Sequence, residues 1–125
     1  MTHDEFIKDF HVIFRRAMNF AEKARREGLL ALEEDIDSGK VDNRDIFEYG
    51  MRFVIDGTEK ELIDKILSNI IDQEKDDFSK ALKIIQKEAV LSIQSGDNPR
   101  ILLAVLNSYT DIPLNDPEFD KLSKI

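Results

Sequence analysis

Cysteine is absent from this 125-residue chain, and glycine, proline and histidine are scarce, with five, three and two copies. Without cysteine there are no disulfides, no thiol catalysis and no zinc site with cysteine ligands. No apolar run approaches the roughly 20 residues that a membrane-spanning helix needs. The N-terminal MTHDEFIKDF lacks the basic start and apolar core of a signal peptide. We therefore expect a soluble, cytoplasmic protein without direct membrane insertion.

The balance of charge is acidic, with 26 acidic against 18 basic residues and a net charge of -8. Proteins that bind nucleic acid usually carry a basic surface, so nucleic acid is not an expected partner. Simple adhesion to anionic lipid is disfavoured for the same reason. Hydrophobic residues make up 42% of the chain, enough for one modest core, and the length fits a single domain.

Residues that could support catalysis or bind a metal are sparse. His3 and His11 are eight positions apart, beyond the i, i+4 spacing at which two histidines of one helix share an ion. The acidic segment DQEKDD, residues 72–77, lacks the glycine and terminal glutamate of a calcium-binding loop. With two histidines in the chain, a serine–histidine–aspartate triad is a poor prospect. The sequence predicts no enzymatic activity, no cofactor and no metal.

Apolar residues recur at spacings of three and four along almost the whole chain, which predicts an all-α domain of about five helices. The first helix is expected from about Asp4 to Arg26. Gly28 bends or interrupts it, and helix resumes through the core-filling segment LLAL, residues 29–32. A loop is expected at residues 38–43.

Capping signals place the next helices. Asp42 or Asn43 can cap a helix that Gly57 ends. Thr58 and Glu61 fit a capping box for a helix starting at Glu59. After Gly96, Asp97 or Asn98 can cap a further helix with Pro99 in its first turn. Pro113 and Pro117 mark a loose acidic tail with one last turn at most.

The segment from Glu59 to Ser95 contains neither proline nor glycine and allows two folds. Its two apolar stripes flank the polar residues 72–77, where the chain either continues as one long helix or turns into a hairpin. A continuous helix of about 36 residues would span roughly 54 Å. That length would require an intertwined dimer, because a small domain cannot cover both ends. The residues expected in the core under either fold are Phe10, Phe14, Leu29, Leu32, Ile46, Phe53, Leu62, Ile66, Leu82, Ile85 and Leu103.

Two sequence blocks carry a family resemblance. AEKARREGLLALEEDI, followed by YGMRFVIDGTEKELI, contains the run A-R-x-E-G-L-L-x-L-E at Ala24–Glu33 and then Gly50, Asp56 and Gly57. EAVLSIQSGDNPRILLAVL contains L-x-I-Q-x-G-x-N-P-R at Leu91–Arg100. The first block resembles the cytoplasmic loop of MotA, the flagellar stator subunit of the MotA/TolQ/ExbB proton channel family. The second is similar to the C-terminal cytoplasmic segment of that family.

The resemblance implies a division of the chain and a departure from the family. Residues 1–75 correspond to the loop and residues 78–109 to the C-terminal segment, while residues 110–125 form a tail. In MotA, two membrane helices lie between the two blocks, and here only residues 72–77 join them. The chain therefore resembles the soluble parts of a stator protein without its channel, and no proton conduction is expected.

The same resemblance points to an interaction site. In the family, the loop contacts the rotor switch protein FliG through charged residues, and the matching positions here are Arg25 and Glu33. Together with the adjacent Arg26 and Glu34 they form the expected interaction site. On one continuous helix, Arg25 and Glu33 would lie about 80° apart around the axis, within reach of one partner. The alternative is that both are surface charges that pair weakly with neighbours such as Glu22 or Asp35.

The expected function is thus a non-catalytic interaction module of the bacterial flagellar motor. Its partners would be FliG or stator subunits, and its context motility and chemotaxis. The alternative is a self-assembling structural or regulatory helical protein, such as a homodimer, without rotor contact.

Overall fold

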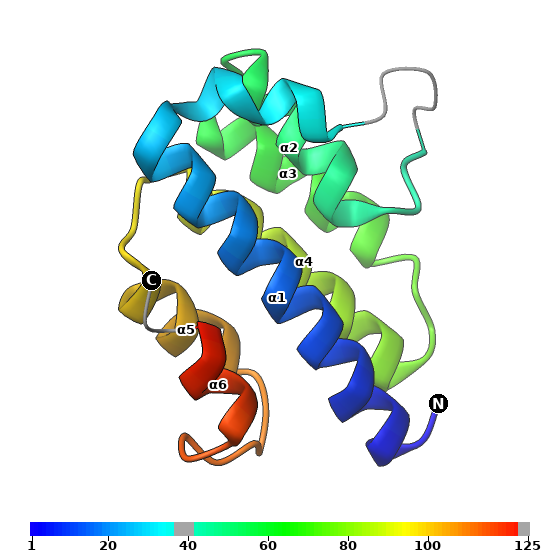
Figure 1. The fold of residues 1–125 in the computed structure, drawn as a ribbon. Coiled ribbons are helices and arrows are strands. Elements are labelled where there is room, and N and C mark those ends of the chain that lie inside the picture. The colour runs from blue at the N-terminus through cyan, green and yellow to red at the C-terminus, as the bar shows by residue number, and fades with distance from the viewer. Residues whose placement is uncertain (37–41, 123–125) are drawn as a thin grey trace.

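The structure, a computed structural model, describes residues 1–36 and 42–122, which contain helices, turns and bends but no strand. The all-α prediction is therefore confirmed for this part of the chain. None of its helices is both long and apolar enough to cross a membrane. The elements are α1 (His3–Glu27), the 3-10 helix η1 (Leu29–Asp35), α2 (Ile46–Ile55), α3 (Lys60–Ile71), α4 (Asp77–Gln94), α5 (Pro99–Asn107) and α6 (Pro117–Leu122) (Figure 1).

The first helix begins and ends close to the predicted residues. The Thr2 hydroxyl accepts from the Glu5 backbone N–H at 3.2 Å, and Glu5 accepts in turn from the Thr2 N–H at 3.1 Å. This reciprocal capping box satisfies two backbone donors that a helix leaves free at its start. The helix ends before Gly28, whose φ of 91° and ψ of 161° lie in a region that essentially only glycine occupies. The predicted interruption at Gly28 is confirmed, but the chain resumes as a 3-10 helix.

The segment from Glu59 to Ser95 forms a hairpin, so the alternative of one long helix is wrong. α3 ends at Ile71, and Asp76 caps α4 by accepting from the Ser79 backbone N–H at 2.8 Å. The two helices are then joined across the hairpin by Lys87, whose Nζ lies 2.8 Å from Asp64 Oδ1. An intertwined dimer built on one long helix therefore loses its structural basis.

Two of the predicted caps are also wrong. α2 is capped by Asp45, which accepts from the Glu48 backbone N–H at 3.1 Å, because Asp42 is turned toward Arg44 instead. α3 begins after Glu59 without a side-chain cap, and the predicted box of Thr58 and Glu61 does not form.

Two further boundary predictions concern the start of α5 and the loop before α2. The cap of α5 by Asn98, with Pro99 as its first residue, is confirmed. Most of the loop expected at residues 38–43 lies outside the described residues.

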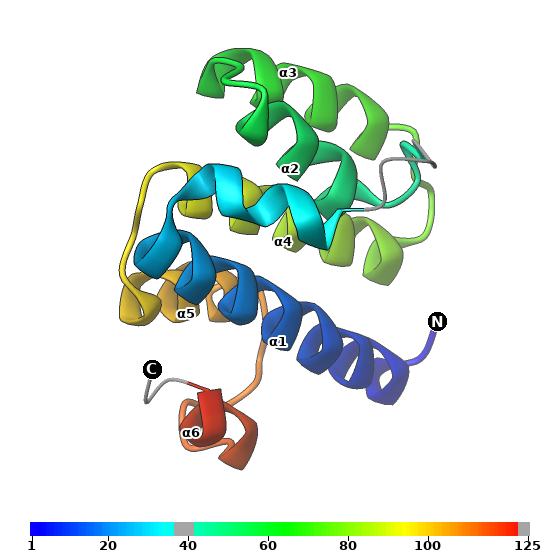
Figure 2. The same cartoon turned by 45° about the horizontal axis from the view of Figure 1, so that its top comes forward.

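α4 is the central helix and contacts α1, α2, α3 and α5. It runs beside α1 in the same direction, and near the starts of these two helices the rings of Phe6 and Phe78 lie 5.3 Å apart. The α2–α3 hairpin covers one side of this pair, and α5 and α6 lie on the other (Figure 2). η1 crosses between the end of α1 and α2, so it rests on the edge of the bundle.

The core is close to the predicted one, with exceptions on α3. That helix turns Ile63, Leu67 and Ile71 inward, which leaves Leu62 49% exposed and Ile66 only half-buried. Three further residues expected inside are half-buried: Leu29, Phe53 and Leu103. Confirmed as buried are Phe10, Phe14, Leu32, Ile46, Leu82 and Ile85.

Gly50 on α2 lets three helices approach closely. A Cβ at this position would lie 2.8 Å from Val90 Cγ2 on α4 and 3.0 Å from Leu67 Cδ1 on α3. Both distances are shorter than ordinary van der Waals contacts between carbon atoms.

The C-terminal segment is held more firmly than a loose tail. Phe119 of α6 is 1% exposed, and its ring lies 5.0 Å from that of Phe14. The imidazole of His11 hydrogen-bonds Asp116 at 3.1 Å, and that of His3 hydrogen-bonds Asp111 at 2.9 Å. The predicted last turn is present, but the expectation of a loose tail is wrong up to α6, because the buried Phe119 anchors this segment.

Candidate functional site

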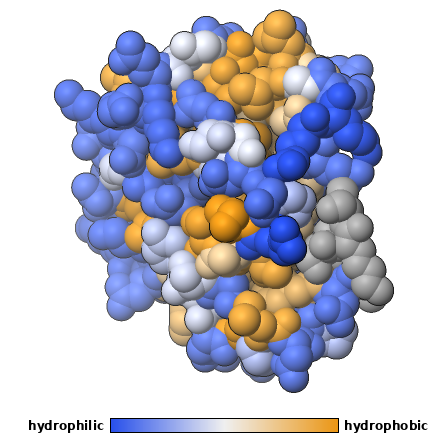
Figure 3. All heavy atoms as spheres, turned by 90° about the vertical axis from the view of Figure 1, so that its left-hand side faces the viewer, coloured by the Kyte–Doolittle hydropathy of each residue, from blue (hydrophilic) through white to orange (hydrophobic). Residues whose placement is uncertain are grey.

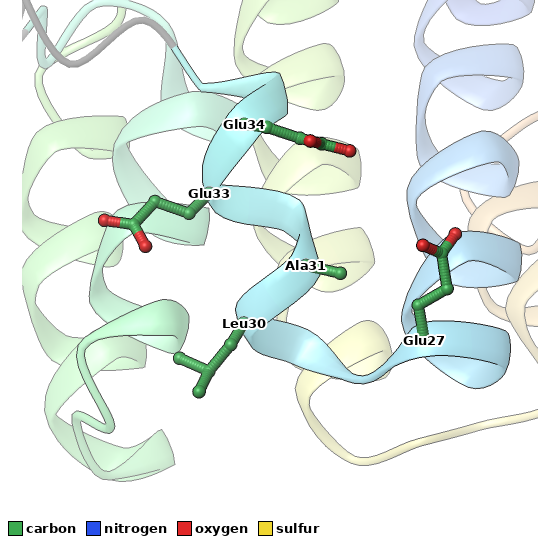
Figure 4. A pocket seen from close by; sticks show the side chains of 5 residues that line it. All are labelled: Glu27, Leu30, Ala31, Glu33 and Glu34. Carbon is green, nitrogen blue, oxygen red and sulfur yellow. The ribbon is translucent and has the colours of Figure 1, made fainter.

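The four charged residues singled out in the sequence lie on two different helices. Arg25 and Arg26 are in the last turn of α1, whereas Glu33 and Glu34 are on η1. All four are exposed. The 80° relation, which holds for one continuous helix, does not apply here, because the chain changes direction at Gly28 and η1 lies beside the end of α1 (Figure 4).

The 3-10 geometry of η1 sorts its side chains into three columns, since residues three apart eclipse each other in such a helix. One column faces inward and contains Leu32, which is completely buried. A second column, Leu30 and Glu33, points away from α1, and a third, Ala31 and Glu34, points toward it (Figure 4). The direction of each charge is therefore set by the local helix type.

Arg26 and Glu34 are both engaged within the molecule. Arg26 forms an ion pair with Glu22 one turn earlier, and Glu34 forms one with Lys23. Lys23 also donates to Asp35 at 2.8 Å. Hydrogen bonds to Asp35 and then Glu34 raise the pKa of the Lys23 ammonium above its usual value. The Lys23 contacts tie η1 to α1, whereas the Arg26–Glu22 pair lies within α1, so Arg26 and Glu34 are both engaged in local structure.

Arg25 and Glu33 are not engaged in this way. Within residues 1–36 and 42–122, neither has an ion-pair partner within 4.0 Å. The neighbours expected to pair with them, Glu22 and Asp35, are taken by Arg26 and Lys23. Local pairing therefore does not account for these two charges.

The two unengaged charges border different hollows. Arg25 lines a hollow of about 120 Å³ at the junction of α4 and α5, together with Gln94 and Asp97. Glu33 borders a smaller one of about 40 Å³ at the end of α2, together with Asp56. A partner that meets both charges must therefore reach around the end of α1 and η1.

Glu33 also lines a broader, shallow hollow along η1 that sequence reasoning missed. It has a volume of about 440 Å³ and is lined by Glu27, Leu30, Ala31, Glu33 and Glu34 (Figure 4). Leu30 is 72% exposed, the highest value among the large hydrophobic residues in the described part of the chain. The segment LLAL was expected to fill the core, and only the break at Gly28 together with the 3-10 turn could have signalled otherwise.

The surface around this end of the molecule is mixed in character. On the face drawn in Figure 3, apolar surface appears in its upper part, over η1 and the α2–α3 hairpin, and again lower down, over α5. Hydrophilic side chains separate the two areas (Figure 3). The end of the molecule that carries Arg25 and Glu33 therefore also exposes apolar surface.

The second sequence block builds structure around the site. Gln94 Nε2 donates to the Thr58 carbonyl at 2.8 Å, which joins the end of α4 to the α2–α3 turn. The Ser92 hydroxyl donates to Asp97 at 2.8 Å, and Asn98 caps α5. These contacts shape the α4–α5 junction beside Arg25.

A polar network away from this surface joins α3 to α4. Lys87 Nζ lies 3.1 Å from the Ser68 hydroxyl and 2.8 Å from Asp64. The Lys87 ammonium holds the pKa of the Asp64 carboxyl below its usual value. Among the residues described, no group of three histidine, aspartate or glutamate side chains could hold a metal ion.

Comparison with known proteins yields two related sequences. No family profile matches the chain, and no solved structure matches it. It is 34% identical over 86 residues to Motility protein A of Treponema phagedenis. The aligned region covers 67% of this chain and 32% of that protein. It is also 38% identical over 61 residues to Motility protein A of Borreliella burgdorferi. This second aligned region covers 49% of this chain and 22% of that protein. The chain thus spans about a third or less of the curated relatives it matches, and its similarity to them supports the predicted relationship to MotA.

Proposed function

We propose that this protein is a non-catalytic, MotA-like interaction module of the bacterial flagellar motor. It acts in the cytoplasm and contacts the rotor switch protein FliG, or a stator subunit, through Arg25 and Glu33. The similarity to Motility protein A supports the motor context. The geometry of the charged residues supports the choice of surface.

One observation carries the proposal: of the four exposed charges, two form ion pairs within the described part of the molecule and two do not. Arg26 and Glu34 have ion pairs, whereas no such pair forms for Arg25 or Glu33 within the described residues. Charges presented in this way steer association and select partners of opposite charge at the matching positions. The partner is therefore expected to offer an acidic group to Arg25 and a basic group to Glu33.

Charge reversal tests this surface. Binding of FliG is measured by calorimetry for the wild type and for Arg25→Glu and Glu33→Lys. Each reversal turns an attraction into a repulsion, so we expect affinity to fall by about tenfold or more, equivalent to about 1.4 kcal/mol. Matched controls are Lys65→Glu and Glu61→Lys, which make the same charge changes at exposed positions of α3.

The possible outcomes separate the elements of the proposal. If both reversals bind FliG as tightly as the controls do, this surface is not the binding site. If the wild type does not bind FliG, the same variants are tested against stator subunits. Failure to bind either protein would remove the motor-module proposal.

Self-assembly is a second candidate function that one observation favours. Residues 101–110 contain no charged side chain in a chain that is 35% charged. Ile101 and Tyr109 are 47% and 43% exposed there. Two copies that met along this segment would bring none of its own side-chain charges together, in a chain whose net charge is -8. Light scattering at low micromolar concentration tests this candidate, and a monomer would eliminate it.

A further inference from the structure

We propose that Leu30 is the apolar anchor of a docking surface that receives a basic, amphipathic helix of the partner protein. The docking surface consists of Glu27, Leu30, Ala31, Glu33 and Glu34. The inference rests on the proposed function and adds to it an apolar contact and the chemical class of the bound segment.

The exposure of Leu30 has no purpose in the packing of the molecule itself. Leu32, two positions on, is completely buried and holds η1 on the bundle, and Leu29 is half-buried beside it. Leu30 falls in a different column of the 3-10 helix and is 72% exposed above a shallow hollow. Leu30 is the one large apolar side chain among the five residues that line this hollow, and protein interfaces combine an apolar core with a polar rim.

The rim of the docking surface selects the sign of the partner. All three of its ionisable side chains are glutamates. Glu34 is engaged by Lys23, and Glu27 lies 3.6 Å from Arg26, which leaves Glu33 as the carboxylate available to an incoming cation. Acidic peptides, nucleic acids and anionic lipid surfaces are disfavoured, because the whole chain also carries a net charge of -8.

The spacing of Leu30 and Glu33 fits a helix. They are three residues apart in one column, and a 3-10 helix rises about 2.0 Å per residue, so their backbones are about 6 Å apart along its axis. Residues three or four apart on an α-helix are separated by about 4.5–6 Å along its axis. An apolar residue and a lysine or arginine at that spacing can therefore contact Leu30 and Glu33 at the same time, in the manner of helix-in-groove recognition.

The first experiment tests the surface without assuming the identity of the partner. A helix-stabilised peptide with leucine and arginine repeated four residues apart is titrated into the labelled protein and followed by NMR. Chemical-shift changes are expected at Glu27–Glu34 and are expected to disappear in Leu30→Ser. A matched peptide with glutamate in place of arginine should cause none. Shifts elsewhere, no shifts, or shifts that persist in Leu30→Ser would each overturn the proposal.

The second experiment uses FliG and a matched pair of exposed leucines. Leu30→Ser is expected to weaken binding about tenfold, whereas Leu114→Ser, at a leucine that is 67% exposed before α6, should leave it unchanged. Leu30→Met should retain affinity, because it keeps the apolar volume. Urea unfolding of all three variants should match the wild type, which separates a binding defect from a folding defect.

The two proposals fail in different ways. If Arg25→Glu and Glu33→Lys lose FliG while Leu30→Ser retains it, the apolar anchor is wrong and the proposed function stands. If neither FliG nor a stator subunit binds the wild type, the proposed function fails, and the peptide titration still decides whether the docking surface accepts a basic helix.

Discussion

α4 buries seven of its residues, from Leu82 to Ile93, whereas η1 buries only Leu32 among its own. Both segments contain several aliphatic residues, so composition alone does not show which of them is buried. α4 is surrounded by four helices, and almost every apolar side chain along its second half finds a partner. η1 lies at the edge of the bundle, and its 3-10 turn directs Leu30 and Glu33 outward. Packing therefore decides the role of residues in α4, and local backbone geometry decides it in η1.

The largest expected difference in stability is between truncating an aliphatic side chain in α4 and truncating one in η1. Ile85→Ala on α4 should lower the free energy of unfolding by about 2–5 kcal/mol, because it removes a completely buried side chain and leaves a cavity. Leu30→Ala on η1 should change it by less than about 0.5 kcal/mol, because that side chain is mostly exposed. Urea denaturation followed by circular dichroism measures both. Equal losses would show that η1 belongs to the core.

Gly28→Ala probes the backbone that directs η1. We expect a loss of about 1–3 kcal/mol, because any Cβ is strained at the φ of 91° and ψ of 161° that Gly28 adopts. No atom lies within 4 Å of the added Cβ, so no second substitution nearby should relieve the loss. Urea denaturation measures the loss, and hydrogen exchange of the η1 amides reports whether the segment has moved. An unchanged stability would mean that Gly28 does not enforce the break.

Gly50→Ala probes packing against α4. Overpacking of about 1–3 kcal/mol against Val90 should outweigh a gain in helix propensity of up to about 1 kcal/mol, for a net loss of about 1–2 kcal/mol. Unlike the loss of stability at Gly28, the loss at Gly50 should be relieved by shortening Val90. The double variant with Val90→Ala should therefore be more stable than the sum of the two single losses predicts. Strict additivity in a double-mutant cycle would contradict the close approach.

The smallest expected effect concerns the ion pair that joins α3 to α4. Lys87→Met should raise the pKa of Asp64 toward the ordinary aspartate value of 3.8, which NMR titration of the carboxyl group measures. Because the folded-state pKa of Asp64 is depressed, the stability from this pair is present above pH 3.8 and is lost as the pH falls through the depressed value. Asp64 is 49% exposed, so the effect should stay below about 1 kcal/mol. A pKa that does not move in the variant would show that Lys87 is not its cause.

Much of the fold could be predicted because the signals are local. The spacing of apolar residues, Gly57 as a helix end and Asn98–Pro99 as a helix start each depend on a few neighbouring positions. The predicted start of α2 was wrong. Asp42 or Asn43 was expected as its cap, whereas Asp45 caps the helix and Asp42 hydrogen-bonds Arg44.

The candidate site was only partly predictable. The sequence pointed to Arg25, Arg26, Glu33 and Glu34 as a group, but it could not separate engaged from unengaged charges. That separation depends on Lys23, which reaches from α1 to Glu34 and Asp35 after the chain has turned at Gly28. The exposure of Leu30 was not predicted, because the apolar pattern of an α-helix and that of a 3-10 helix look alike in sequence. Leu30 is a surface residue because of the column that it occupies on η1.

By itself, the sequence determined the all-α class, most helix boundaries and the relationship to MotA, since these depend on residue type and spacing along the chain. The tertiary structure decided that Glu59–Ser95 folds back as a hairpin, that Phe119 anchors the C-terminal segment, and that Leu30, Arg25 and Glu33 face solvent. The physical reason is that burial and ion pairing are set by groups distant in sequence, whose positions depend on how all the helices pack.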